Sequence, residues 1–349
     1  MTLKIKVLNA IGGIPDLMLM NVPDLTIKKN SIDRETYLRR LAFYDPDCWD
    51  ERDPFFYLPN EPPGREIIET EPFLSGRRDL IRYPSRYVPR NPEVNDDFNS
   101  RRENLAGYLH LWRHDDSTAR PLVLIIHGLM MGGPKKARRM FKIDRLFQLG
   151  LDLALHTLPG HWRRSDDPRA QRLLDPADLP LTVERQAQNL HDLHSAQLLL
   201  RQLGYEKIGI IGASMGGFTA ALYATQVVSG PDFMFLAVPA VAVKRYLKPR
   251  PGRFGFPIDS ALVRATERAQ ELCSPLYLTP RFDVGRIRLV AHAGDRICEA
   301  RDTRRWIENW GVKDYVEVVG GHWLYLDRQA RGEAWYGLLR ERGYISGGV

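Results

Sequence analysis

The sequence predicts an α/β fold, a doubly wound and mostly parallel β-sheet with helices on both faces. Short apolar runs such as residues 122–126 are typical of strands that a parallel sheet buries on both faces. Stretches with apolar residues at helical spacing, such as 182–203, alternate with those runs. The connections between them are short, as in successive β-α-β units.

The expected strands begin with two candidate edge strands and a third whose apolar residues alternate with polar ones. The six that follow are mainly apolar. In order, the strands are expected at residues 65–70, 79–84, 104–112, 122–126, 152–156, 207–211, 233–238, 286–292 and 315–319.

Helices are expected between these strands because apolar residues recur there at helical spacing. Pro134 stands where proline favours the start of a helix, and Thr182 is expected to cap the helix that it precedes. The expected helices cover residues 134–149, 182–203, 217–224, 303–310 and 334–342.

Length and composition indicate a globular protein with material for a large core. The chain has 349 residues, of which 44% are apolar. Residues 1–60 lack clear periodicity, so we expect an N-terminal extension packed on a main domain at 61–349. Residues 242–283 separate two core strands, and we expect them to form a lid insertion.

Several protein classes are disfavoured by the sequence. No apolar run reaches the roughly 18 residues of a membrane span, and no cleavage site follows the N-terminus, so a cytoplasmic protein is expected. Cys48, Cys273 and Cys298 are too few and too widely spaced for a disulfide framework or a metal cluster. No nucleotide-binding motif is present, so no cofactor is expected. The net charge of +7 comes from arginines interspersed with acidic residues, which argues against a nucleic-acid partner.

Residues 212–216 read Gly-Ala-Ser-Met-Gly and lie between an expected strand and an expected helix. A Gly-x-Ser-x-Gly at such a junction indicates a nucleophile elbow, a turn so tight that the serine backbone is strained. Side chains two positions before and after the serine would collide, which explains Gly212 and Gly216. Ser214 is therefore the candidate nucleophile.

A serine hydroxyl needs a base, and the base needs an orienting acid. Asp295 and His322 each follow an expected strand, and in doubly wound sheets chemistry gathers at the carboxyl ends of strands. The chain order serine, acid, base is the order expected with a nucleophile elbow. Asp302 is a weaker candidate for the acid because it falls within the next helical segment.

An oxyanion also needs backbone N–H donors, and Met215 is expected to supply one at the start of the helix after the elbow. The loop after residue 126 begins His127-Gly128-Leu129. Here the chain resembles the α/β-hydrolase superfamily over residues 61–349, most nearly its esterase and lipase branches. The resemblance implies that the Leu129 amide is the second donor. His127 is expected to brace this loop through its ring nitrogens.

We therefore expect a serine hydrolase that cleaves an ester or a thioester through an acyl-enzyme. A peptidase or an acyltransferase with the same triad, or a binding protein that keeps only the fold, remain alternatives. The first part of the insertion carries Lys244, Arg245 and further basic residues without an acidic one. We expect these two residues to contact the substrate and to favour anionic small-molecule substrates. The sequence does not indicate the oligomeric state.

Overall fold

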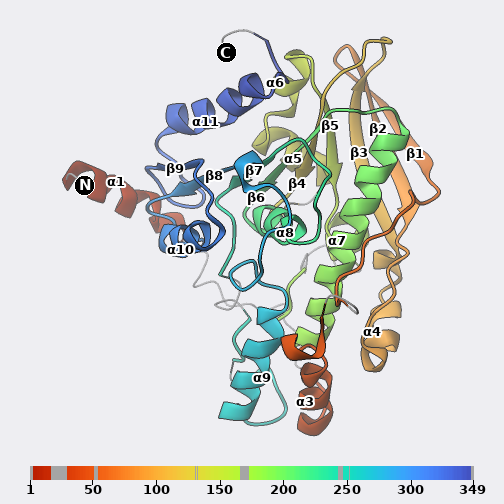
Figure 1. The fold of residues 1–349 in the computed structure, drawn as a ribbon, viewed down its shortest axis with the longest axis vertical. Coiled ribbons are helices and arrows are strands. Elements are labelled where there is room, and N and C mark those ends of the chain that lie inside the picture. The colour runs from red at the N-terminus through yellow and green to blue at the C-terminus, as the bar shows by residue number, and fades with distance from the viewer. Residues whose placement is uncertain are drawn as a thin grey trace.

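Most of the chain is described by a computed structural model. It covers residues 3–16, 30–50, 54–129, 131, 133–165, 173–242, 247–250 and 252–346. Over these residues nine strands form one sheet in the order β1-β2-β3-β5-β4-β6-β7-β8-β9. The strands from β5 to β9 in this order are parallel, whereas β1, β2 and β3 are antiparallel to their neighbours. The predicted α/β fold class is confirmed (Figure 1).

The strands have the following bounds: β1 Glu66–Phe73, β2 Gly76–Pro84, β3 Ala106–His114, β4 Leu122–Ile126, β5 Asp152–His156, β6 Ile208–Ala213, β7 Met234–Ala237, β8 Ile287–His292 and β9 Tyr315–Val318. The α-helices are α1 Leu3–Gly12, α3 Arg34–Ala42, α4 Asn95–Asn99, α5 Gly133–Met140, α6 Ile143–Gln148, α7 Leu179–Gln202, α8 Met215–Ala224, α9 Ser260–Glu271, α10 Ala300–Trp310 and α11 Arg328–Glu341. No helix among the described residues is long and apolar enough to cross a membrane.

The central strand β4 separates two hydrophobic cores. Leu122, Leu124 and Ile126 belong to the core that also takes in the apolar side chains of α7, α8 and α10. Val123 and Ile125 belong to the opposite core, which α5, α6 and α11 cover. Because neighbouring side chains of a strand point to opposite faces, an uninterrupted apolar strand is buried on both sides. Helices therefore cover both faces of the sheet, as predicted (Figure 1).

Residues 30–50 pack against the insertion at 242–283. Helices α3 and α9 lie side by side (Figure 1), and Arg268 of α9 forms ion pairs with Asp45 and Asp47 at 2.5 and 2.7 Å. The Tyr37 ring meets the Phe254 ring edge-on with 5.3 Å between centroids. The two segments that the sequence places outside the core thus stabilise each other. The division of the chain at residue 60 stays a proposal.

Three helix predictions were wrong in detail. The helix expected at 334–342 begins at Arg328. The helix expected at 134–149 is divided into α5 and α6, because Lys142 has a left-handed backbone with φ of 53°. The helix expected to start after Thr182 begins at Leu179, and the Asp178 carboxylate caps it by accepting a hydrogen bond from the Leu181 N–H. The Thr182 hydroxyl donates instead to the Asp175 carbonyl.

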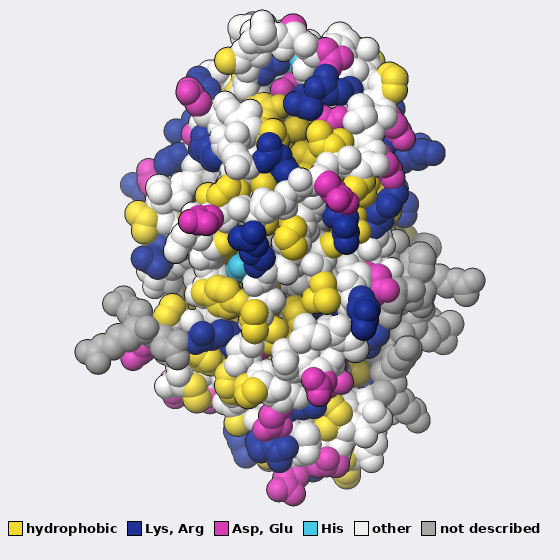
Figure 2. All heavy atoms as spheres, turned by 90° about the vertical axis from the view of Figure 1, so that its right-hand side faces the viewer, with side chains coloured by type: hydrophobic (Ala, Val, Ile, Leu, Met, Phe, Trp, Pro, Cys, Tyr) yellow, Lys and Arg dark blue, Asp and Glu magenta, His cyan; other side chains and the backbone are white. Residues whose placement is uncertain are grey.

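The face of the molecule that carries β1 to β3 has a mixed charge. Figure 2 shows lysine and arginine side chains scattered among acidic and apolar ones there, with no continuous basic stripe. Arg113 pairs with Asp79 at 2.7 Å, and Arg78 pairs with Glu71 at 2.9 Å. The basic residues of these strands are therefore engaged in ion pairs within the protein.

Candidate active site

Ser214 lies in the sharp turn between β6 and α8. Its φ of 55° and ψ of −115° are strained for a residue with a side chain. The turn is fixed on both sides, because the Ser214 N–H donates to the Ala237 carbonyl at 2.9 Å and its carbonyl accepts from the Ala240 N–H at 3.1 Å. This is the predicted elbow conformation, and neighbouring β7 holds it in place.

The two glycines of the turn allow a very close approach of backbone segments. A Cβ at Gly212 would lie 2.3 Å from the Gly216 carbonyl oxygen. A Cβ at Gly216 would lie 2.0 Å from the Ile126 carbonyl oxygen. Both distances are too short for any side chain, so the predicted requirement for glycine at these positions has a direct steric cause.

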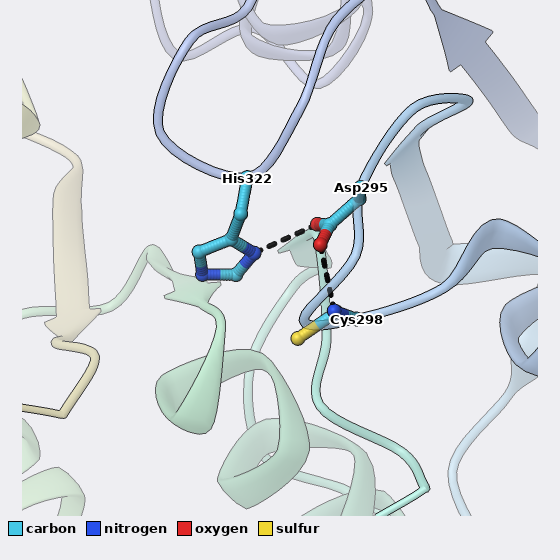
Figure 3. A group of neighbouring side chains, drawn as sticks. All are labelled: Asp295, Cys298 and His322. Carbon is cyan, nitrogen blue, oxygen red and sulfur yellow. Dashed lines mark hydrogen bonds and ion pairs between the residues drawn. The ribbon is translucent and has the colours of Figure 1, made fainter. Parts of the chain in front are cut away.

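Ser214, His322 and Asp295 form a chain of hydrogen bonds. The His322 Nε2 is 3.1 Å from the Ser214 Oγ, and its Nδ1 is 2.7 Å from the Asp295 Oδ2. Figure 3 shows the imidazole and the carboxylate pointing toward each other from separate loops, which follow β9 and β8. The Asp295 Oδ1 accepts hydrogen bonds from the backbone N–H groups of Ile297 and Cys298 at 2.8 and 2.7 Å. The carboxylate is therefore held in one orientation, and the structure brings the three predicted residues together.

The surroundings of His322 raise its pKa well above the usual value. Burial alone would lower this pKa, but contacts with Cys298 and Asp295 outweigh that effect. Burial also raises the pKa of the Cys298 thiol, which leaves it uncharged at neutral pH. The Asp295 carboxylate is thus the partner that stabilises the imidazolium under those conditions.

The loop after β4 lies against the elbow. A Cβ at Gly128 would come within 3.4 Å of the Ser214 Cβ and 3.9 Å of its Oγ, so the next peptide N–H, that of Leu129, belongs to the same neighbourhood. Met215 is the first residue of α8, where the N–H has no partner within the helix. Both predicted donors thus lie on segments that adjoin the serine.

His127 braces this loop as the sequence predicts. Its Nδ1 is 2.8 Å from the Gly128 carbonyl oxygen, and its Nε2 accepts from the Leu158 N–H at 3.2 Å. Since Nε2 accepts, the proton is on Nδ1. Burial lowers the pKa of this imidazole to about 4, so it is neutral at pH 7.

Cys298 is a member of the site that the sequence analysis missed. It is buried, and its sulfur lies on the imidazole side of Asp295 (Figure 3). Asp295, Cys298 and His322 offer donor atoms within 4.8 Å of one another, a set that suits Zn²⁺. In the sequence, the only sign that Cys298 belongs to the site is that it stands three residues after Asp295. The geometry of the loop is what brings its thiol near His322.

A shallow recess, too narrow to hold a water molecule, lies next to the elbow. Asp302, the weaker candidate for the acid, lines it from α10, while Asp295 occupies the position beside His322. The full lining is Pro239, Ala240, Val241, Ala242, Ile297, Cys298, Glu299 and Asp302. The expected substrate contacts Lys244 and Arg245 lie outside the described residues.

Residues 122–332, more than half of the chain, match the alpha/beta hydrolase family. The chain belongs to this family. The superfamily resemblance seen in the sequence is therefore confirmed, and the order of the parallel strands and the elbow after β6 agree with it. A search of curated proteins found no match.

Solved structures of similar fold include esterases and peptidases. A cold-adapted esterase from an Arctic intertidal metagenomic library matches at 15% identity and a TM-score of 0.51, over 80% of this chain and 98% of its own. Carboxyl esterase 2 from the mycorrhizal fungus Tuber melanosporum matches at 15% identity and a TM-score of 0.48, over 90% of this chain and 100% of its own. A prolyl endopeptidase matches at 19% identity and 0.48, over 68% of this chain, which spans only 37% of that peptidase. At such identities the likeness concerns the fold alone.

Proposed function

We propose that this α/β hydrolase family member is a serine hydrolase that cleaves esters or thioesters through an acyl-enzyme. The observation that carries the proposal is the hydrogen-bonded series from Asp295 through His322 to Ser214, which ends at a strained elbow. A serine, an imidazole and a carboxylate in this arrangement have the geometry needed to activate a hydroxyl.

In the proposed reaction the Ser214 Oγ attacks the carbonyl carbon of the substrate while His322 Nε2 takes its proton. The hydrogen bond from Nδ1 to Asp295 keeps Nε2 free to accept and stabilises the imidazolium that forms. The Met215 and Leu129 N–H groups stabilise the negative charge on the substrate oxygen. His322 then donates the proton to the leaving group, and water deprotonated by the same imidazole cleaves the acyl-enzyme.

A fluorophosphonate probe tests the nucleophile directly, because it phosphonylates only an activated serine. The wild-type protein is expected to label once, at Ser214, and Ser214→Ala not at all. Ser260→Ala is the matched control, since Ser260 is an exposed serine at the first position of α9. A wild-type protein that resists the probe would contradict the proposal and favour a binding protein on this fold.

A substrate panel then separates the reaction classes. Acyl esters, acyl thioesters and aminoacyl amides are compared by kcat/KM, and the proposal expects the first two to be hydrolysed faster than amides. Faster hydrolysis of amides would favour the peptidase alternative, and transfer of the acyl group to an added alcohol in preference to water would favour the acyltransferase.

The insertion is proposed to favour anionic substrates. Lys248 and Arg250 are exposed in the described part of its basic stretch. Salt screens such long-range attraction, so turnover of an anionic ester is expected to fall with ionic strength more than turnover of a neutral analogue. Equal salt dependence of the two substrates would refute this part of the proposal.

A further inference from the structure

The N-terminal segment 3–16 lies against both loops that carry the proposed acid and base. A Cβ at Gly294 would lie 2.3 Å from the Asn9 carbonyl oxygen, and a Cβ at Gly321 would lie 2.0 Å from that of Gly12. The Asn9 Oδ1 accepts a hydrogen bond from the Gly320 N–H at 3.0 Å. Backbone that is about 300 residues away in the sequence thus packs directly on the site.

Asp16 connects the two loops through one buried carboxylate, which is 0% exposed. Its Oδ2 accepts from the His322 N–H at 2.8 Å and from the Arg296 N–H, next to Asp295, at 3.1 Å. Its Oδ1 accepts from the Trp323 N–H at 3.3 Å. The backbone of the proposed base and the backbone beside the proposed acid therefore share one hydrogen-bond acceptor.

The loop before His322 needs such an external restraint. It contains Gly320, with φ of 138°, and Gly321, and glycine backbones have more conformational freedom than any other residue. Proton transfer requires the imidazole to stay near 3 Å from the Ser214 hydroxyl, and a misplacement of 1 Å costs roughly 100-fold in rate. Hydrogen bonds to a buried carboxylate are strong enough to fix the loop.

We propose that Asp16 is a positioning residue for the reaction, and that it holds His322 at the distance at which proton transfer occurs. This inference rests on the proposed function. Asp16→Ala removes all three hydrogen bonds, and Asp16→Asn keeps one oxygen but turns an N–H₂ group toward backbone N–H groups. Both variants are expected to lower kcat roughly 100-fold while KM changes little, because the ester is bound by other residues.

The control is Asp33→Ala, which removes the carboxylate that caps α3. It tests whether loss of a capping acceptor in the N-terminal region lowers kcat by itself. Thermal unfolding is measured for every variant, and rates are compared well below the lowest melting temperature. Asp16→Ala is expected to react slowly with the fluorophosphonate but to completion, since Ser214 is intact.

The outcomes separate the two proposals. If Ser214→Ala and His322→Ala retain activity, the proposed function fails. If those variants are inactive but Asp16→Ala keeps the wild-type kcat, or if Asp33→Ala lowers kcat equally, the positioning role of Asp16 is overturned. A fall in kcat confined to the Asp16 variants supports it.

The outer face of the same segment carries a second, independent observation. Within α1 successive residues are 100° apart, which places Asn9 and Gly12 toward the protein and Val7 and Ile11 on the opposite side; Ile14, beyond the turn at Gly13, is exposed as well. These three apolar side chains are 49, 44 and 49% exposed. Ile5 and Leu8 of α1 are half-buried, as is usual for the apolar residues of a surface helix, whereas Val7 and Ile11 turn apolar side chains to the outside.

Basic groups stand next to the apolar residues on α1 itself, and further basic and aromatic groups contact the same N-terminal segment. Lys4, Lys6 and Arg296 are exposed, and the Arg296 side chain lies against Gly13. Helix α1 contains no acidic residue. Trp323, whose N–H is bonded to Asp16, is 46% exposed, and tryptophan is favoured at membrane–water interfaces. Apolar, basic and indole groups together match an anionic lipid surface.

We infer that the outer face of α1 docks on anionic lipid bilayers. The full-length protein is mixed with vesicles of phosphatidylglycerol and phosphatidylcholine, or of phosphatidylcholine alone, and the bound fraction is measured by flotation. Binding is expected only with the anionic vesicles. The double change Lys4→Ala with Lys6→Ala is expected to weaken it roughly 30-fold.

Val7→Asp and Ile11→Asp are expected to abolish flotation with the vesicles. The matched control is Val228→Asp, which alters a valine that is 66% exposed between α8 and β7 and is expected to bind as the wild type does. Labelling of Ser214 by the fluorophosphonate reports whether each variant is folded. Failure of the wild type to float, or equal loss of binding in Val228→Asp, would overturn the inference. A dimer that Val7→Asp dissociates would overturn it too, in favour of an interface between copies.

Discussion

Acid is expected to destabilise this protein at a pH where most proteins are still stable. Burial, the largest effect in each case, lowers the pKa of six imidazoles: to about 3 for His110 and His161, and to about 4 for His127, His156, His194 and His292. In the unfolded chain a histidine takes up its proton near pH 6.5. Below that pH the unfolded state binds more protons than the folded state, so stability falls as the pH falls.

The size of the effect follows from these values. At pH 5.5 each of the six histidines favours the unfolded state by about 1.3 kcal/mol relative to pH 7.5, and together they reach roughly 8 kcal/mol. A typical domain has a free energy of unfolding of about 5–15 kcal/mol. His322 has the opposite sign, because its pKa is raised. Its stabilising contribution grows as the pH falls toward 6.5 and is complete below that pH, so between pH 7.5 and 5.5 it offsets part of the loss caused by the six histidines.

Urea denaturation at a series of pH values between 7.5 and 5.5 measures this effect above the usual pKa range of carboxyl groups. Burial raises the pKa of Asp178 and Glu184, so any protonation of these two offsets part of the loss. His194→Gln removes one of the six imidazoles and can keep a hydrogen bond to the Tyr223 hydroxyl, which lies 2.6 Å from the His194 Nδ1. The variant is expected to lose about 1.3 kcal/mol less than the wild type over this range. Comparing the change within each protein cancels any constant effect of the substitution. A wild type with constant stability, or equal losses in the two proteins, would refute the reasoning.

Four further predictions concern the site and its elbow. Asp295→Asn is expected to lower kcat about 10⁴-fold. The wild-type kcat/KM should fall in acid with an apparent pKa above 6.5, because the His322 pKa is raised. In Asp295→Asn this acidic decline in kcat/KM should move to lower pH. An unchanged position of the decline would exclude Asp295 as the cause of the raised pKa. Zn²⁺ is expected to inhibit hydrolysis, because a zinc ion bound to the His322 imidazole would prevent it from accepting the proton of Ser214, and EDTA should restore activity. Initial rates of Cys298→Ser are measured with and without Zn²⁺. Inhibition as strong as in the wild type would argue against ligation by the thiol. Gly216→Ala is expected to lower the free energy of unfolding by at least about 3 kcal/mol, because its Cβ would lie 2.0 Å from a carbonyl oxygen. Urea denaturation measures this change, and an unchanged free energy of unfolding would contradict the prediction.

Local patterns were enough to predict the sheet and the elbow. The apolar runs at 122–126 and 152–156 have the bounds of β4 and β5, because each is bordered by loops with clear turn residues. Gly212 and Gly216 indicated a tight turn without room for side chains, and the short distances from a Cβ at either position to neighbouring carbonyl oxygens confirm this. These features depend on residues close together in the sequence, where periodicity and backbone geometry decide the outcome.

Features that depend on distant residues could not be predicted in the same way. Helix α1 was not expected, because it exposes Val7 and Ile11 and buries the polar Asn9, which obscures the usual pattern of one apolar and one polar side. Nothing near Asp16 in the sequence indicates that it meets backbone 306 residues away. The Cys298 thiol is close to Asp295 in the sequence, but its approach to His322 arises from the curvature of one loop.

The contact between Asp16 and His322 has a consequence for synthesis in the cell. Translation at roughly 5–20 residues per second separates the appearance of these two residues by tens of seconds. During that time residues 3–16 cannot yet contact the loop that carries His322, and their apolar side chains are available to chaperones or to lipid. The domain cannot be completed from one end to the other, because this contact joins residues 16 and 322, a long-range closure of the kind that slows folding.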